Sequence, residues 1–392
     1  MRPVGVWLVG ARGSIAAVVT AGHAALARGE ASPAGLVTAR APFTAAALPP
    51  IDALVFGGHE IRAGRLAAEA DAVLTGCGLP GFAARYTDAL DAIDRRIRPG
   101  VVRGGGHAIH ALADDAVAAP TDAAAVAAIR ADLDAFKAET GARRVVVVNV
   151  ASTEPPAAPH PAWAELDALR AAIDDPESIL PPSALYAMAA FEGGDAYVNF
   201  TPSLGSRIPA LDALARETGA VHAGSDGKTG ETLVKSVLAE VFARRNLPVL
   251  SWFGQNILGN GDGAILDHPD NKATKVKSKD HLLAKILGAP VESKVGIDYV
   301  QSLGETKIAW DHIHFQGFLG GRMSLQFTWT AADSLLAAPL VLDLVRLAAF
   351  AMERGERGVL PALAPFFKDP MGTDEQRLVA QDEALLRWLS DA

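Results

Sequence analysis

The first forty residues carry the pattern that most constrains the fold. Residues 4–9 form an uninterrupted apolar run, VGVWLV, which predicts a buried strand ending at Gly10. Residues 14–28 then repeat apolar side chains at helical spacing, and residues 35–38 predict a second strand. A strand, a helix and a strand in this order make a βαβ unit. The chain is therefore predicted to open as a parallel sheet.

The rest of the chain predicts one large sheet and a smaller inserted one. Residues 145–150, 197–200 and 220–223 read as further buried strands. Apolar and polar side chains alternate strictly over residues 323–330, which is typical of a strand buried on one face, and residues 295–302 and 308–315 read as its neighbours. The predicted fold is α/β: a Rossmann-like doubly wound parallel sheet with an inserted α+β lobe carrying a mixed or antiparallel sheet. We expect boundaries at residues 1–245, 246–331 and 332–392.

Composition restricts the partners of this chain. The formal net charge is −9, which repels nucleic acid and anionic membranes. The most apolar helical stretch, residues 335–352, is interrupted by Asp343 and Arg346, so no membrane span is expected. The single Cys77 permits no intrachain disulfide, which favours a reducing, cytoplasmic location.

A glycine-containing loop follows the first strand. The loop contains Gly10, Ala11, Arg12, Gly13, Ser14 and Ile15. Small residues at a strand-to-helix turn let the backbone approach a pyrophosphate, and the helix N-terminus meets its charge. The alternative is a tight turn without a ligand. No acidic residue follows the predicted second strand to bind the ribose of NAD. NAD is still the preferred cofactor, while Arg40 leaves NADP open.

Polar residues also follow three later strands, where ligands bind in open α/β sheets. These loops include Ser152 and Thr153, then Thr201, then Asp226, Lys228, Thr229 and Gly230. Ordinary turn chemistry is the alternative reading for each loop taken alone. The sequence Gly-Lys-Thr at 227–229 is not a P-loop, because that motif requires glycine at position 222 and this chain has His222.

Lysine is distributed unevenly along the chain. There are 11 lysines against 25 arginines, yet residues 228–307 hold nine lysines and two arginines. A lysine ammonium can lose its proton when desolvated, whereas a guanidinium effectively cannot. Lys275 and Lys279 would share one side of a helix and repel each other unless an anion relieves them. We read these lysines as candidates to stabilise a phosphate or an enolate; the alternative is a solvated helix face.

Other candidate sites carry weaker signals. The glycine- and asparagine-rich loop at 256–263 is either a plain turn or a loop facing a polyol or cofactor, and it lacks the spacing of an EF-hand. His59 and Glu60 lack the second histidine of a metal motif, and Asp333 is explicable as a helix N-cap.

Several motifs together resemble the myo-inositol-phosphate synthases, particularly the shorter archaeal-type form. They are VWLVGA at 6–11, FGGHEIR at 56–62, VNVASTEP at 148–155, NFTPS at 199–203, GKTGETLVK at 227–235, NILG at 256–259, SLLAAP at 334–339 and FFK at 366–368. The resemblance implies an NAD-dependent cyclase that converts D-glucose 6-phosphate to 1D-myo-inositol 3-phosphate. The implied steps are oxidation at C5, enolisation at C6, intramolecular aldol closure onto C1 and reduction.

The resemblance also assigns residues and partners. The family's active-site lysines fall on Lys275, Lys279, Lys307 and Lys368, and its proton-relay aspartate falls on Asp333. Asp226 corresponds to a position beside the nicotinamide. Asn256, Leu258 and Asp262 match positions around the cofactor and a possible divalent or monovalent cation. Lys228, Thr229, Gly230 and Asn256 are the implied substrate-binding residues. The resemblance further implies a homotetramer built largely on the sheet of the inserted lobe.

Departures from the family pattern leave the substrate open. Leu266, Asp267 and His268 stand where relatives often have Leu-Ser, near the implied sugar-phosphate site. The main alternative is a synthase-like enzyme that closes a five-membered carbocycle from fructose 6-phosphate. Two further alternatives are a simple sugar-phosphate dehydrogenase and a catalytically inactive NAD-binding sensor.

Overall fold

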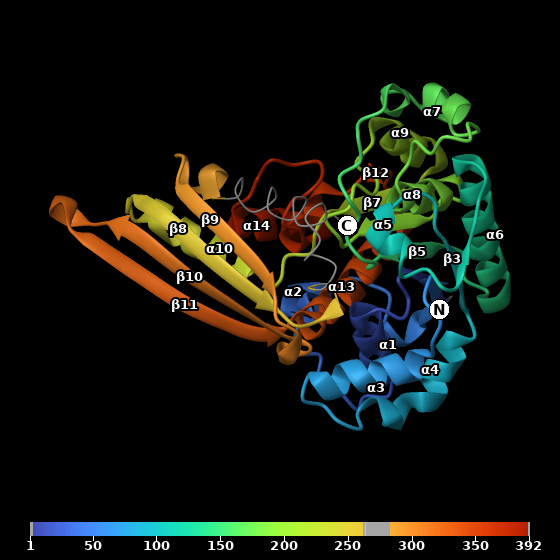
Figure 1. Cartoon of the computed structure of the whole chain (residues 1–392), viewed down its shortest axis with the longest axis horizontal. Coiled ribbons are helices and arrows are strands. Elements are labelled where there is room, and N and C mark those ends of the chain that lie inside the picture. Colours follow the sequence, from blue (N-terminus) through green and yellow to red (C-terminus); the bar gives the residue numbers. More distant parts are fainter. Residues whose placement is uncertain (1–2, 262, 264–282, 391–392) are drawn as a thin grey trace.

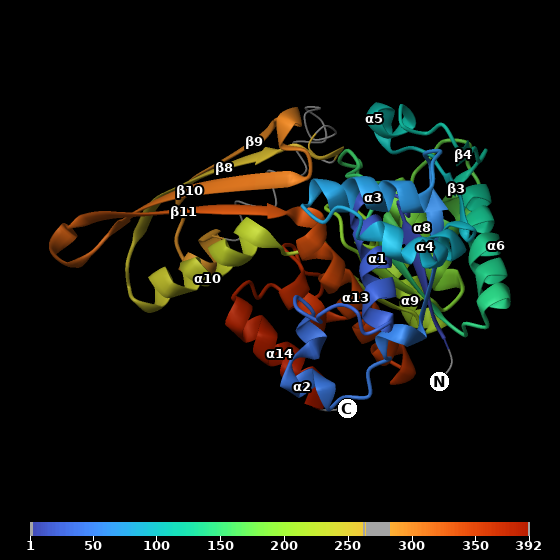
Figure 2. The same cartoon turned by 90° about the horizontal axis from the view of Figure 1, so that it is seen from below.

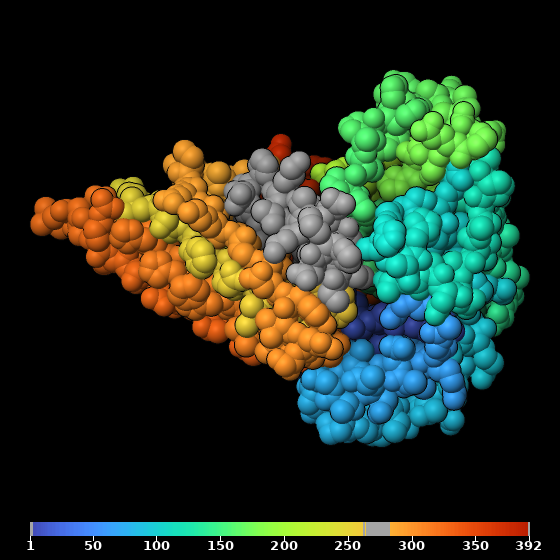
Figure 3. Space-filling view, in the orientation of Figure 1, coloured from blue at the N-terminus to red at the C-terminus, as the bar shows by residue number. Residues whose placement is uncertain are grey.

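The computed structural model of the chain describes residues 3–261, 263 and 283–390. They form a large body around an eight-stranded sheet and a lobe around a four-stranded sheet. The lobe tapers away from the body, and its β10–β11 hairpin reaches farthest from the large sheet (Figures 1 and 3). The predicted fold class, a Rossmann-like sheet with a separate mixed sheet, is confirmed.

The large sheet is parallel throughout, with the strand order β12-β7-β6-β5-β1-β2-β3-β4. Its strands are β1 (Val4–Val9), β2 (Leu54–Glu60), β3 (Ile97–Val101), β4 (Ala116–Val117), β5 (Val145–Asn149), β6 (Ala196–Asn199), β7 (Val221–Gly224) and β12 (Gly358–Val359). The central strand β1 lies between β2 and β5, with Val6 opposite Phe56 on one side and Val146 on the other. All these strands therefore end at the same edge of the sheet, which is where the site lies.

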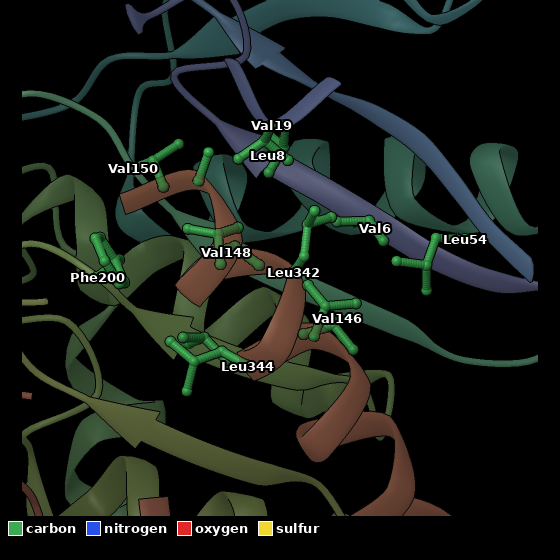
Figure 4. Packing of buried hydrophobic residues seen from close by; sticks show 14 of the residues in the cluster. Val6, Leu8, Val19, Leu54, Val146, Val148, Val150, Phe200, Leu342 and Leu344 are labelled. Carbon is green, nitrogen blue, oxygen red and sulfur yellow. The ribbon is translucent and has the colours of Figure 1, made fainter. Parts of the chain in front are cut away.

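Helices cover both faces of the large sheet. They are α1 (Ser14–Ala27), α2 (Ala41–Thr44), α3 (Leu66–Gly76), α4 (Thr87–Asp94), α5 (Gly106–His110), α6 (Asp122–Thr140), α7 (Leu166–Ala172), α8 (Pro182–Glu192), α9 (Pro209–Thr218), α13 (Asp333–Glu353) and α14 (Leu378–Ser390). Successive side chains of β1 point to opposite faces, so Val6 and Leu8 pack with α1 and α13 while Trp7 and Val9 pack with α6 and α8. Figure 4 shows the first of these cores, in which Leu342 and Leu344 of α13 approach Val146 and Val148 of β5.

Helix α13 is long and apolar enough to cross a membrane by length and composition, and it is the one helix of this kind in the described ranges. In the folded chain, 72% of the most apolar 18-residue stretch of α13 is buried, because the helix packs across the large sheet. Its composition is that of a core helix.

The predicted strand at residues 35–38 is wrong. Val37–Ala39 forms a short 3₁₀ helix, η1, and the strand beside β1 is β2, about twenty residues further on. The backbone N–H groups of Val37 and Thr38 donate to the Asp343 carboxylate of α13, at 2.6 and 3.1 Å. The Asp343 carboxylate therefore accepts the backbone N–H groups that would have donated to a neighbouring strand if residues 35–38 formed a strand.

The small sheet has the strand order β11-β10-β8-β9 and is mixed, since β8 and β9 are parallel while the other neighbours are antiparallel. Its strands are β8 (Val249–Leu258), β9 (Glu292–Tyr299), β10 (Thr306–Gln316) and β11 (Arg322–Ala332). Helix α10 (Gly230–Arg244) lies against one face of the small sheet (Figure 2). There Phe242 packs with Trp252 and Ile313. Leu325 and Phe327 join this cluster, so the alternating pattern predicted a strand buried on one face correctly.

Candidate active site

The glycine loop forms a close turn between β1 and α1. Gly10 has a φ of 84°, and a Cβ there would lie 2.9 Å from the Cα of Ala151. Gly13 is the N-cap of α1 and makes no side-chain cap. The first N–H groups of a helix lack intrahelical partners, so this end of α1 is suited to an anion such as a pyrophosphate.

A cavity of about 420 Å³ lies at the carboxyl edge of the large sheet, against this loop. Its volume is within the range of small-molecule and cofactor sites. Most residues predicted to bind a cofactor line it: Gly10, Arg12, Gly13, Ser14, Ile15, Ser152, Thr153, Thr201 and Asp226. Ala11 is buried within the turn beneath them. Tertiary packing thus brings loops from β1, β5, β6 and β7 to one cavity.

Glu60 is an acidic residue of this cavity that the sequence analysis did not assign to the cofactor. It ends β2, beside the glycine loop, and its carboxylate accepts N–H groups of Arg12 and Ile61, both at 2.9 Å. An acid at the end of the second strand occupies the position that binds a cofactor ribose in Rossmann folds. Because the second strand was predicted at residues 35–38, the acid that ends the actual second strand was not recognised as a ribose-binding candidate. Arg40 instead lies on the surface and pairs with Asp382.

His59 is a buried side chain in the lining of the cavity, with partners at both ring nitrogens. Its Nε2 lies 3.1 Å from Asp132, and its Nδ1 lies 3.0 Å from the hydroxyl of Tyr186. Burial lowers the pKa of His59, so the neutral ring is favoured. Within the described residues, no group of three or more His, Cys, Asp and Glu side chains could hold a metal ion.

Two lysine–carboxylate pairs face the cavity from different parts of the chain. The Lys368 ammonium lies 2.8 Å from Asp226, and the Lys307 ammonium lies 3.0 Å from Asp333. The Lys368 and Lys307 side chains retain 12% and 16% of their exposure, so both charges are largely withdrawn from water. Asp226, Asp333 and Lys368 line the cavity directly. The structure therefore brings together four residues that are separated in the sequence.

A short antiparallel pairing sets the position of Lys368. The Lys368 N–H donates to the carbonyl of Asp226 at 2.7 Å, and the Lys228 N–H donates to the carbonyl of Phe366 at 2.8 Å. Between them, Gly227 forms a bridge with Phe367, and a Cβ at Gly227 would lie 2.1 Å from the ring of Phe200. This close approach explains the glycine, and the pairing places Lys368 beside Asp226.

The structure does not bring Lys228 into the cavity. Its side chain is 2% exposed and turns toward α14, where its ammonium donates to Gln381 at 2.8 Å. Its neighbour Thr229 lines the cavity, and Gly230 begins α10 with a φ of 50°. Of these three predicted substrate-binding residues, Thr229 lines the cavity, whereas Lys228 and Gly230 do not.

The loop after β8 contributes differently from the prediction. Asn256 and Leu258 are buried at 1% and 3% exposure on the face of β8 that α10 covers, and neither lines the cavity. The Asn256 amide has no hydrogen-bond partner among the described residues. Asn260 and Gly261 line the cavity instead, and the run of glycine and asparagine was their signal. Asp262, Lys275 and Lys279 lie outside the described residues, as do Leu266, Asp267 and His268.

Glu154 is a buried acid at the edge of the same cavity. Its carboxyl accepts the N–H and the hydroxyl of Ser183, at 2.7 and 2.6 Å, where α8 begins. Burial raises the pKa of Glu154 to about 7, although these hydrogen bonds favour the ionised form.

A glycine turn at the edge of a parallel sheet, faced by buried lysine–carboxylate pairs, defines an α/β enzyme of the Rossmann-like, dinucleotide-binding class. Within that class, the chain belongs to the myo-inositol-1-phosphate synthase family, whose model matches residues 4–390.

Individual relatives agree with this assignment. Inositol-3-phosphate synthase 1 of Bacteroides thetaiotaomicron is 38% identical over 254 residues, which are 62% of this chain and 59% of that protein. An inositol-3-phosphate synthase structure from Caenorhabditis elegans shares the fold, with a TM-score of 0.89, 24% identity and coverage of 99% of this chain and 85% of that one. A myo-inositol-1-phosphate synthase-related protein from Thermotoga maritima has a TM-score of 0.81 and 26% identity, with 99% of both chains covered. The match thus spans somewhat more than half of the Bacteroides relative's length.

Proposed function

We propose that this chain is an NAD-dependent cyclase that converts D-glucose 6-phosphate to 1D-myo-inositol 3-phosphate. The observation that carries the proposal is the pair of lysine–carboxylate contacts, Lys307–Asp333 and Lys368–Asp226, at the cavity that follows the glycine loop. A plain dehydrogenase needs one base for one proton, whereas oxidation, enolisation and ring closure put negative charge on several oxygens of one substrate.

The cofactor part of the proposal rests on the fit of the cavity. Gly10 permits the close turn against Ala151, the N-terminus of α1 has no side-chain cap on its first N–H groups, and Glu60 ends β2 at the position where a ribose would bind. NAD, when bound, accepts a hydride from the sugar and returns it. Glu60 also supports NAD over NADP, because its carboxylate would repel a 2′-phosphate. A divalent or monovalent cation near Asp262 belongs to the same proposal.

The lysines would stabilise charge and move protons. Lys307 and Lys368 present ammonium groups in a poorly hydrated site, where each would stabilise an alkoxide or enolate oxygen more strongly than in water. Asp333 and Asp226 would orient these ammonium groups and balance their charge. We assign Lys275 and Lys279 the same kind of role at the remaining oxygens, from the family pattern.

The substrate phosphate would lie at the N-terminus of α10. Thr229 is its N-cap residue without a side-chain cap, and Gly230 opens the helix with no side chain to obstruct an anion. The helix has 15 residues, long enough for its N-terminal dipole to attract a phosphate.

The experiment that tests the proposal is incubation of the purified protein with NAD and glucose 6-phosphate, followed by ³¹P and ¹³C NMR. A cyclitol phosphate without net NADH supports the proposal. Conversion of fructose 6-phosphate alone would overturn the substrate assignment in favour of a five-membered carbocycle. Stoichiometric NADH would identify a dehydrogenase, and binding without turnover would identify a sensor.

We further propose a homotetramer assembled on the open face of the small sheet. Phe253 and Trp310 are 39% and 37% exposed there and stack edge to face, with ring centroids 5.8 Å apart. An exposed aromatic pair on an uncovered sheet face favours association with another copy. Light scattering should give four times the chain mass, and Trp310→Asp should reduce it. An unchanged mass in that variant would contradict this interface.

A further inference from the structure

Lys228 is a buried lysine without a role in the proposed chemistry. Its side chain is 2% exposed, faces away from the cavity and donates to the neutral amide of Gln381. Burial lowers the pKa of Lys228 to about 8, and Glu240 on α10 partly opposes this shift. Burying an ammonium against an amide is unfavourable in itself. A buried lysine at this position must therefore make a contribution that offsets the free-energy cost of its desolvation.

Lys228 connects two segments that are far apart in the chain. Its backbone belongs to the loop after β7, where its N–H pairs with Phe366. Its side chain reaches the first turn of α14, and Gln381 continues the link by donating to the carbonyl of Glu375 at 2.6 Å. Lys228 thus holds the C-terminal segment at both ends: before Lys368 through its backbone, and after Lys368 through its side chain.

Lys368 lies inside the loop that these contacts close. The Ser225 N–H donates to the carbonyl of Asp369 at 2.8 Å, and the Met371 N–H donates to the carbonyl of Gly224 at 2.8 Å. A 3₁₀ helix (Pro361–Phe366) ends two residues before Lys368, and the segment 368–371 that follows has no helix or strand of its own. Its position depends on contacts with the β7 loop and with α14.

We infer that Lys228 is a positioning residue for Lys368: it fastens α14 to the loop after β7 and thereby holds the Lys368 ammonium against Asp226. The inference rests on the proposed function only for the role of Lys368. A displacement of about 1 Å of a reacting group can lower a rate about 10²-fold. Loss of the Lys228 contacts should therefore lower the rate of turnover.

The first test is a double-mutant cycle on the rate of NADH formation in single-turnover stopped flow with sugar phosphate. Lys228→Met should slow this step by about 10²-fold while the Kd for NAD stays within about threefold. In a Lys368→Met background, the same change should have almost no further effect. Equal slowing in both backgrounds would overturn the inference, because Lys228 would then act independently of Lys368.

Lys285→Met is the matched control. Lys285 also contacts the C-terminal stretch, through Asp374 at 2.9 Å, but it is 43% exposed and lies outside the cavity. Its loss should leave the rate unchanged. Gln381→Leu removes the same bond from the other side and keeps the inference testable where Lys228→Met fails to fold.

The second test does not use activity. Hydrogen–deuterium exchange at the Lys368 and Asp369 amides should accelerate at least tenfold in Lys228→Met and not in Lys285→Met, while β5 stays protected. Unchanged exchange at these amides would contradict the inference even for an active enzyme. Accelerated exchange in a protein that makes no cyclitol phosphate would contradict the proposed function alone.

Discussion

The large and the small sheet hold their buried charges in different ways. In the body, buried carboxylates accept backbone N–H groups: Asp122 accepts those of Ile179 and Leu180, and Asp343 accepts those of Val37 and Thr38. Beneath the small sheet, three charged side chains contact one another, and one of them, Asp311, also accepts the Trp252 indole N–H at 2.6 Å. Lys235 lies 2.8 Å from Glu231 and 3.4 Å from Asp311, and all three are at most 2% exposed.

This difference predicts different responses to mutation. A carboxylate held by backbone N–H groups keeps those donors when a nearby side chain changes. In the Glu231–Lys235–Asp311 cluster, each charge depends on the others, because burial raises the pKa of Asp311 and the Lys235 ammonium opposes that rise. We therefore expect a single substitution beside a buried carboxylate of the body to cost little stability. A single substitution in the Glu231–Lys235–Asp311 cluster should destabilise the whole cluster.

The largest expected effect lies where the two regions meet at the cavity. Lys307→Met removes an ammonium supplied by the small sheet, and Lys368→Met removes one supplied by the body. Each should lower cyclisation of glucose 6-phosphate by about 10³-fold or more, because developing negative charge then lacks its partner. Isothermal titration should show NAD affinity within about threefold of the parent. Lys294→Met, at a side chain 72% exposed, is the control, and a similar loss there would contradict the assignment.

The lobe cluster should show the next largest effect, on stability. Lys235→Met leaves two carboxylates buried together and should lower the free energy of unfolding by about 3 to 5 kcal/mol in chemical denaturation. The control is Lys137→Met in the body, since Asp195 keeps Arg130 at 3.0 Å and the Val145 N–H at 2.9 Å. If both variants lost the same free energy of unfolding, the expected difference between the buried charges of the body and those of the lobe would be wrong.

The body holds two buried carboxyl groups that should titrate near neutrality, because burial raises the pKa of Asp343 to about 6 and that of Glu154 to about 7. The pKa of Glu154 is about 7 in the folded chain, above its ordinary value of 4.5, so the folded state prefers the protonated form. Its stabilising contribution is complete below about pH 4.5 and is lost as the pH rises through 7. Between pH 5 and 7 this loss amounts to about 2 kcal/mol. Glu154→Gln should reduce the pH dependence of unfolding over that range by this amount and leave the part that Asp343 contributes, whereas an unchanged slope would show that Glu154 does not titrate there.

The smallest expected effect concerns cofactor choice. Glu60→Gln removes the charge that would repel a 2′-phosphate and should improve NADP binding relative to NAD by about tenfold, measured as the ratio of Kd values. Arg40→Gln, at a surface pair with Asp382, should leave this ratio unchanged. A change in the ratio of Kd values for the Arg40 variant would instead support the prediction from the sequence that Arg40 allows NADP to bind.

Side-chain direction separates the predicted site residues that lie at the cavity from those that lie away from it. The lysine-rich segment indicated Lys307, and the structure finds it beside Asp333 near the cavity. The same reasoning could not tell that Lys228, two residues after Asp226, turns the other way. That direction depends on the pairing with residues 366–368 and on Gln381 of α14, which are about 140 to 150 residues distant.

Local patterning in the chain was enough to predict the apolar runs of β1 and β5, the alternation of β11 and the glycine turn before α1. These follow from side-chain periodicity and from the backbone freedom of glycine. Only the tertiary structure decided that Glu60 stands beside the glycine loop, that residues 37–39 leave the sheet for Asp343, and that Lys368 meets Asp226. Contacts between distant residues arise from the packing of whole elements, which no local pattern contains.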